Sequence, residues 1–171
     1  GELQAAAEGR LPERLIEVED LRGDLHMHTT ASDGRNSIEQ MAQAALARGY
    51  EYIAITDPSA THGFGNHVTP EQLRAQIEAV REVNARIDGI EVLIGTETNI
   101  LPDGSPDYGD DLLAELDWAM GSVHTSFGMS EAEMTARMIA ACEHPWIDCI
   151  GHLTGRKIEQ RQPYALNVDR L

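Results

Sequence analysis

The chain has 171 residues, of which 42% are hydrophobic and 25% charged, a size and composition ordinary for one soluble globular domain. Its 29 acidic and 13 basic residues give a formal net charge of −16, which argues against a domain that binds nucleic acid by itself, because phosphate neutralisation requires clustered Lys and Arg. No apolar run approaches the roughly 20 residues that a membrane helix needs, and no signal-peptide pattern opens the chain, so we expect a cytoplasmic protein without a membrane partner.

The chain opens with a polar, helix-prone lead-in at residues 1–22, and we expect the folded domain to occupy residues 23–171. That domain begins at a short strand-like run, LRGDLHMHT. Ser37 and Gln40 then form a capping-box pattern, in which each side chain satisfies a backbone amide of the other residue. This pattern predicts a helix, which Gly49 terminates.

The alternation of strand and helix continues through the middle of the chain. Tyr52–Thr56 is a continuous apolar strand, and Thr69–Gln72 is a second capping box with proline at the first helical position. Glu91–Gly95 is the third apolar strand.

The last third of the chain repeats the pattern. A short helix near Asp110–Leu116 leads to a fourth strand at Asp117–Gly121, and Ser130–Glu133 is a third capping box. Ile147–Gly151 is the fifth strand, and Asn167–Leu171 resembles the start of another helix that is cut short.

The chain has two cysteines, which flank a turn. Cys142 and Cys149 lie in apolar surroundings, so a disulfide or a thiolate metal site is conceivable. Two small buried hydrophobes in a reducing cytosol are the favoured interpretation.

Apolar strands alternating with helices five times are typical of an α/β protein whose parallel sheet is covered by helices. A doubly wound open sheet and a β/α barrel both fit this pattern. No glycine-rich phosphate loop follows the first strand, which weighs against a dinucleotide-binding fold.

Each predicted strand delivers an ionisable residue at its carboxyl end. His26 and His28 end the first strand with Asp33 close behind, and the later strands end in Asp57, Glu97, His124 and His152. The carboxyl ends of the strands are where β/α barrels build their active sites. It is improbable that five consecutive strands end in an ionisable residue by chance. We therefore predict a functional site at this end of the sheet.

The residue types in this set favour a metal site. In His26-x-His28 the strand period of two places both imidazoles on one face, where they can share a cation. Imidazole and carboxylate without thiolate suit zinc, manganese or iron acting on water. With this many ligands a second or third metal fits, and Glu97 is the natural bridging carboxylate.

The same motifs resemble those of the PHP (polymerase and histidinol phosphatase) superfamily. The matching segments are Asp24–Gly34, Ala54–Asp57, Gly95–Glu97, Ser122–Thr125 and Gly151–Arg156. The spacing and the His-Leu-Thr-Gly-Arg run are most similar to the C-terminal PHP domain of bacterial-type family X DNA polymerases, and the lead-in resembles the linker that precedes it there.

This resemblance implies a distorted (β/α)7 barrel, here truncated to about five β/α units, with zinc or manganese at up to three positions. It implies phosphoester hydrolysis, in these polymerases 3′–5′ exonuclease or phosphodiesterase action on DNA 3′ ends in DNA repair, beside a covalently joined polymerase domain. Position by position, the matching metal ligands are His26, His28, Asp33, Glu97, His124 and His152, with Glu97 bridging.

Further roles follow from the same match. The expected catalytic residues are Glu97, His124, Asp57 and Arg156. Among them, Asp57 would orient the ligands from behind, and the guanidinium of Arg156 would bind substrate phosphate.

Two departures from the family pattern make the third metal position doubtful. Where the family has a histidine after Thr-Asp, this chain has Pro58, which cannot ligate a metal, although His62 or His67 in the following loop could substitute. The family's last motif, Asp-x-His, is absent because the chain stops at Leu171.

Other functions remain open at this point. The chain could be a catalytically weak module that supports a polymerase domain, or a stand-alone phosphatase for a small phosphomonoester. Ser122 and Ser126 lack the nucleophile-elbow pattern of serine hydrolases. An amidohydrolase-like enzyme usually needs a bridging carboxylated lysine, and Lys157 lies outside the strand ends.

Overall fold

A single parallel sheet organises the protein. The structure, a computed structural model, describes residues 2–59, 61 and 67–171. Its five strands pair in chain order, β1-β2-β3-β4-β5, and every pair is parallel. They are β1 (Gly23–Met27), β2 (Tyr52–Ile55), β3 (Glu91–Asn99), β4 (Trp118–Ser122) and β5 (Cys149–Ile150). The predicted α/β class with a parallel sheet is therefore confirmed.

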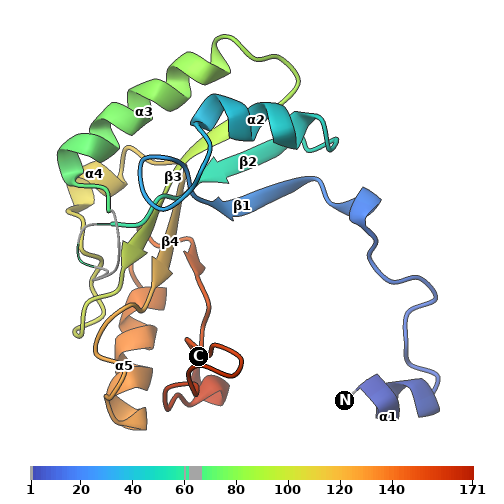
Figure 1. Cartoon of the computed structure of the whole chain (residues 1–171). Helices are drawn as coiled ribbons and strands as arrows, with labels where there is room; N and C mark the ends of the chain where they lie inside the picture. Colours follow the sequence, from blue (N-terminus) through green and yellow to red (C-terminus); the bar gives the residue numbers. More distant parts are fainter. Residues whose placement is uncertain (1, 60, 62–66) are drawn as a thin grey trace.

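The described chain contains five helices, and all of them except the first, which precedes β1, connect successive strands. They are α1 (Glu2–Ala7), α2 (Ile38–Leu46), α3 (Pro70–Asn84), α4 (Asp110–Leu113) and α5 (Glu131–Cys142), with 3-10 turns at Val18–Asp20 and Val168–Arg170. Figure 1 shows α2 and α3 along one side of the sheet, α5 near the lower end of β4, and the lead-in with α1 lying apart from the rest. No helix in the described part of the chain is both long and apolar enough to span a membrane.

The sheet is curled into part of a barrel. Trp118 on β4 donates from its indole nitrogen to the backbone carbonyl of Leu25 on β1, at 3.1 Å. In a flat sheet β1 and β4 would lie about 14 Å apart, since neighbouring strands are separated by about 4.8 Å. The indole therefore crosses the concave side of a sheet that bends β1 toward β4, a half-barrel in which one end of every strand converges.

The helix starts follow the predicted capping boxes. Ser37, Thr69 and Ser130 each accept a hydrogen bond from the backbone amide three residues on, and the side chain of that residue returns one. Satisfying these amides fixes the first turn of α2, α3 and α5. Each helix then buries an apolar stripe, and α3 does so with Leu73, Ile77 and Val80.

Strand β3 is longer than the sequence predicts. It continues four residues beyond Gly95 because its two halves pair with different strands. Glu91–Ile94 pair with β2, and Gly95–Asn99 pair with β4. Glu97 consequently lies within β3 instead of ending it. The last predicted helix forms only the 3-10 turn Val168–Arg170.

The two cysteines are not buried as expected. Cys142, the last residue of α5, is exposed, and Cys149 on β5 is half-buried. Both are free thiols, so the predicted pair of buried hydrophobes is wrong. Cys149 lies on β5, a strand of two residues that pairs on one side only among the described residues.

Candidate metal centre

Glu97 is the centre of the site. Its side chain is 3% exposed, and each carboxylate oxygen faces two histidines. Oε2 lies 3.5 Å from Nε2 of His26 and 3.3 Å from Nε2 of His28. Oε1 lies 3.3 Å from Nε2 of His124 and 2.9 Å from Nε2 of His152. One carboxylate thus connects two pairs of imidazoles.

The strands bring these histidines together. His26 lies on β1 and His28 directly follows it, so the strand period of two turns both rings to the same face, with ring centroids 5.4 Å apart. His124 and His152 each come two residues after a strand, β4 and β5 respectively. His152 takes a positive φ of 28°, a backbone conformation that is uncommon for a non-glycine residue.

The donor set fits divalent cations. Two groups, His26–His28–Glu97 and Glu97–His124–His152, each offer three ligand atoms within 4.8 Å of one another. Imidazole nitrogen and carboxylate oxygen suit zinc and manganese. Glu97 belongs to both groups, as a carboxylate that bridges two ions must.

Strong electrostatic coupling holds the cluster together. Burial would raise the pKa of Glu97, but hydrogen bonds from the four histidines hold that pKa far below its usual range. Burial would lower the pKa of His28, but Glu97 and Asp33 raise it to about 9. The centre of the site therefore attracts positive charge, which a bound cation would supply in place of protons.

Asp33 contacts the cluster from outside. Its Oδ1 lies 2.7 Å from Nδ1 of His28, while the side chain is 67% exposed. Burial would raise the pKa of Asp33, but its hydrogen bond and charge interaction with His28 lower it overall. The structure places Asp33 as the partner of the second nitrogen of His28, an arrangement that orients metal-binding imidazoles, and outside the two groups of three.

Asp57 lies beneath the site and does not face the histidines. The carboxylate is 1% exposed and accepts hydrogen bonds from the amide and hydroxyl of Thr29, both at 2.7 Å, from the hydroxyl of Ser32, and from the amide of Gln76 at 2.9 Å. It therefore anchors the loop between His28 and Asp33 to helix α3.

A pocket of about 520 Å³ opens over the cluster. Besides the four histidines, Asp33 and Glu97, its walls include Pro58, Phe127, Gly155, Arg156, Lys157 and Arg161. Arg156, the predicted phosphate-binding residue, is exposed on this wall. Of the two suggested replacements for a ligand at Pro58, His62 lies outside the described residues and His67 is exposed.

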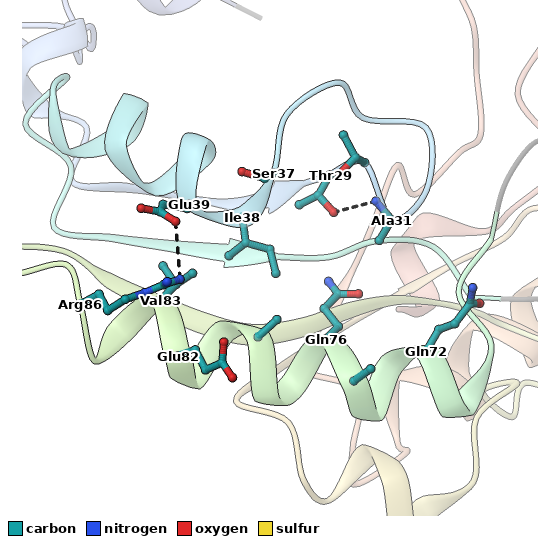
Figure 2. A pocket seen from close by; sticks show the side chains of 13 residues that line it. Thr29, Ala31, Ser37, Ile38, Glu39, Gln72, Gln76, Glu82, Val83 and Arg86 are labelled. Atoms are coloured by element: carbon teal, nitrogen blue, oxygen red, sulfur yellow. Dashed lines mark hydrogen bonds and ion pairs between the residues drawn. The ribbon is translucent and has the colours of Figure 1, made fainter.

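A second pocket of about 510 Å³ lies between α2 and α3 (Figure 2). Glu39 and Arg86 face each other across it at 3.5 Å, and Gln76 points from α3 toward the loop that carries Thr29 and Ala31. Its lining contains no histidine, so residue chemistry and not volume distinguishes the candidate metal centre.

Several residues of the site have no signal in the sequence. Gln76 lies in mid-helix, and Arg161 lies nine residues beyond His152 in an irregular segment. Asn99, at the end of β3, accepts a hydrogen bond from the backbone amide of His124 at 3.2 Å. Only the three-dimensional fold brings these polar side chains to the strand ends.

Comparison with known proteins identifies the relatives of this fold. The model of the PHP domain matches residues 24–161, which is most of the chain. The DNA polymerase/3′-5′ exonuclease PolX of Bacillus subtilis is 43% identical over 157 residues, covering 92% of this chain but 28% of that protein.

Two further relatives are named as a phosphatase and a diphosphodiesterase, and not as a polymerase. A probable phosphatase of Caldanaerobacter subterraneus is 31% identical over 153 residues, covering 86% of this chain and 56% of the relative. A phosphoribosyl 1,2-cyclic phosphate 1,2-diphosphodiesterase of Eggerthella lenta is 34% identical over 76 residues, or 44% of this chain. The chain thus spans between about a quarter and just over half of the length of each of these relatives.

Proposed function

This chain belongs to the PHP domain family, and we propose that it is a metal-dependent phosphoesterase. The observation that carries the proposal is the position of Glu97, whose two oxygens each face a pair of histidines at 2.9–3.5 Å. Four imidazoles around one buried carboxylate form a ligand set for two cations.

Some residues of the site would bind the metals, and others would orient the ligands or bind the substrate. His26 and His28 would hold one cation, His124 and His152 the other, and Glu97 both. Zinc or manganese bound there would supply an activated water and charge neutralisation for phosphoester hydrolysis. Asp33 orients His28, and Asp57 fixes the loop that connects these two residues. Arg156, on the pocket wall, is available to bind a substrate oxygen.

The more specific proposal is 3′–5′ exonuclease or phosphodiesterase action on DNA 3′ ends, within a cytoplasmic family X polymerase that contributes to DNA repair. Its support is the similarity to the Bacillus subtilis polymerase, of which this chain spans 28%. A covalently joined polymerase domain and a complete barrel of seven units belong to this proposal. Asp33 and Pro58, on the same pocket wall, would flank its third metal position.

A second candidate is a phosphatase for a small phosphomonoester, which the similarity to probable phosphatases favours. A catalytically weak module that supports a polymerase domain is the third. Metal content together with hydrolysis of a simple phosphodiester separates the enzymatic candidates from the structural one.

Metal stoichiometry tests the shared carboxylate directly. We expect the wild-type protein, dialysed against zinc or manganese, to retain about two ions per chain by elemental analysis. His26→Ala with His28→Ala should remove one ion, and His124→Ala with His152→Ala should remove the other. Glu97→Ala should remove both, because it would serve both cations.

His144→Ala is the matched control, since that histidine pairs with Asp110 away from the site at 3.6 Å. It should leave the metal content unchanged. Unaltered stoichiometry in the Glu97→Ala protein would refute the proposed centre.

A further inference from the structure

The three basic residues on the pocket wall form no ion pair with the described carboxylates, Asp33 and Glu97 of the same pocket included. Of the ten other arginines, Arg137 is buried against backbone carbonyls, and Arg35, Arg48 and Arg170 form no ion pair with a described residue. The remaining six pair with carboxylates, namely Arg10, Arg14, Arg22, Arg74, Arg81 and Arg86. Arg156, Lys157 and Arg161 form no ion pair with any described residue, although the chain has 29 acidic residues. Three unpaired cations on one pocket wall in so acidic a chain are suited to an anion from outside.

Of these three residues, Arg161 is the one whose side chain is held in place. Its Nε donates to the backbone carbonyl of Gly155 at 2.7 Å, and its guanidinium carbon lies 4.2 Å from the ring centroid of Phe127. Its terminal amino groups donate to no described residue. Phe127 in turn stacks on Tyr164, with centroids 6.2 Å apart and planes 19° apart.

The stack is fixed to the segment that carries His152. Tyr164 is 8% exposed, and its hydroxyl donates to the carbonyl of Leu153 at 2.6 Å. Gly155 has a positive φ of 59°, and a Cβ there would lie 2.6 Å from the Tyr164 ring. Residues 152–164 therefore form one folded unit, whose internal contacts hold the candidate ligand His152 and the guanidinium of Arg161 in a fixed arrangement.

We propose that Arg161 binds a second, non-reacting phosphate of the substrate, beside the phosphate held at the histidine cluster. The inference rests on the proposed phosphoesterase function and adds a separate anion site to it. A guanidinium with two free amino groups matches the oxygens of a phosphate. A pocket of about 520 Å³ has room for more than one phosphate group.

This assignment differs from the one that the sequence motif favours. Arg156, in the His-Leu-Thr-Gly-Arg run, is exposed and has no interaction with a described side chain. A free arginine loses rotamer entropy when it binds, whereas Arg161 is already oriented by Gly155 and Phe127. Arg161 should therefore contribute more than Arg156 to the preference for a substrate with two phosphates over a substrate with one.

The test compares two substrates that differ by one phosphate. We would measure kcat/KM for thymidylyl-thymidine and for the same dinucleotide with a 5′-phosphate, using manganese-loaded protein. Wild type should prefer the phosphorylated dinucleotide about tenfold or more, as expected for one charge-assisted contact. Arg161→Met should reduce that preference to near one without loss of metal, and Arg161→Lys should retain part of it.

Binding provides the same test without turnover. Calorimetry with thymidine 3′,5′-bisphosphate and thymidine 5′-monophosphate should give the same order of preference and the same loss in Arg161→Met. Phe127→Leu should weaken the preference while Arg161 remains, because the guanidinium loses the ring that orients it. Arg48→Met, which removes an exposed arginine of the α2 end, is the charge-matched control.

The outcomes separate the two proposals. No bound metal and no hydrolysis of either dinucleotide would overturn the phosphoesterase function. A metal-loaded, active protein whose preference survives Arg161→Met, or a wild type without any preference in rate and binding, would overturn the second phosphate site alone.

Discussion

Gln76 is the residue through which helix α3 reaches the candidate metal centre. Its amide nitrogen donates to the buried carboxylate of Asp57 at 2.9 Å, and Asp57 holds Thr29 and Ser32. Thr29 follows His28 directly and Ser32 precedes Asp33. One hydrogen bond from a helix thus supports the loop that connects two residues of the site.

Replacing Gln76 should loosen that loop. We expect Gln76→Leu to lower the free energy of unfolding by about 1–3 kcal/mol, the usual loss for a buried hydrogen bond to a charged group. We expect Gln76→Glu to cost more, because it places a second carboxylate against Asp57. Both variants should bind metal more weakly, as shown by competition with a chelator.

Gln43→Glu on the exposed face of α2 is the control for the change in charge. It replaces a weak hydrogen bond to Glu39 with a pair of carboxylates, so it should cost about 0.5 kcal/mol or less and leave metal binding unchanged. Equal stability of wild type and Gln76→Leu would mean that Asp57 holds the loop with its three other donors alone.

At the scale of single residues, the sequence predicts where in the fold a side chain lies better than it predicts which residue that side chain contacts. The strand-end pattern predicts that His26, Glu97 and His152 converge, because parallel strands present the same end to one edge. It does not distinguish Asp33 as a ligand from Asp33 as the partner of Nδ1 of His28, since that depends on the path of an irregular loop. Nor does it predict Arg161, whose position depends on packing against Phe127.

At the scale of elements, α5 is held against the ends of the strands by a buried arginine. Arg137 is 1% exposed, and it donates to the carbonyls of Ile100 and of Thr125, the latter at 3.1 Å. Burial lowers the pKa of Arg137. Ile100 follows β3 and Thr125 follows His124, so this side chain connects the helix to two segments that leave the site.

Removing Arg137 should destabilise the whole domain. Arg137→Ala would leave the buried carbonyl of Ile100 and the half-buried carbonyl of Thr125 without a donor and a void under α5, so we expect a loss of about 3 kcal/mol or more in urea unfolding. Arg137→Lys should recover little, because a single ammonium group does not reproduce the planar fork.

Arg81→Ala, on the exposed side of α3, is the comparison and should cost about 0.5 kcal/mol or less, as is usual for a surface ion pair. A similar small cost for Arg137→Ala would show that solvent replaces the lost hydrogen bonds.

The elements themselves are largely predictable from local chemistry. All three capping boxes start the helices where expected, because the side chain and the amide that it satisfies are neighbours in sequence. The length of β3 is not predictable in the same way. Its last four residues are strand because β4 lies along one side of them and Pro58 bridges to Glu97 on the other, contacts between segments that are distant in the chain.

At the scale of the whole molecule, the lead-in stands apart from the domain. Up to Leu21 its described hydrogen bonds and ion pairs are local, such as those of Arg14 with Glu17 and Asp20, and only Arg22, its last residue, pairs with Glu51 of the domain. It also exposes large apolar side chains, with Leu15 70%, Ile16 82% and Val18 73% exposed. A segment that contributes no buried contact but presents apolar surface favours association over stability.

Deleting residues 1–21 should therefore leave the melting temperature and the metal content of the domain unchanged. The same deletion should reduce the concentration-dependent association of the chain, measured by sedimentation velocity. This outcome would place the domain boundary near residue 22, as the sequence predicts.

A second variant separates the apolar side chains from the length of the segment. Leu15→Glu, Ile16→Glu and Val18→Glu together keep the full chain and should reduce association as the deletion does, because they add charge where the lead-in is most exposed. If the deletion and the triple variant associate as wild type does, the contact must come from elsewhere. The edge strands β1 and β5, each paired on one side only among the described residues, would then be the surfaces to examine. If the deletion lowers the melting temperature, the lead-in packs against the domain and the predicted boundary is wrong.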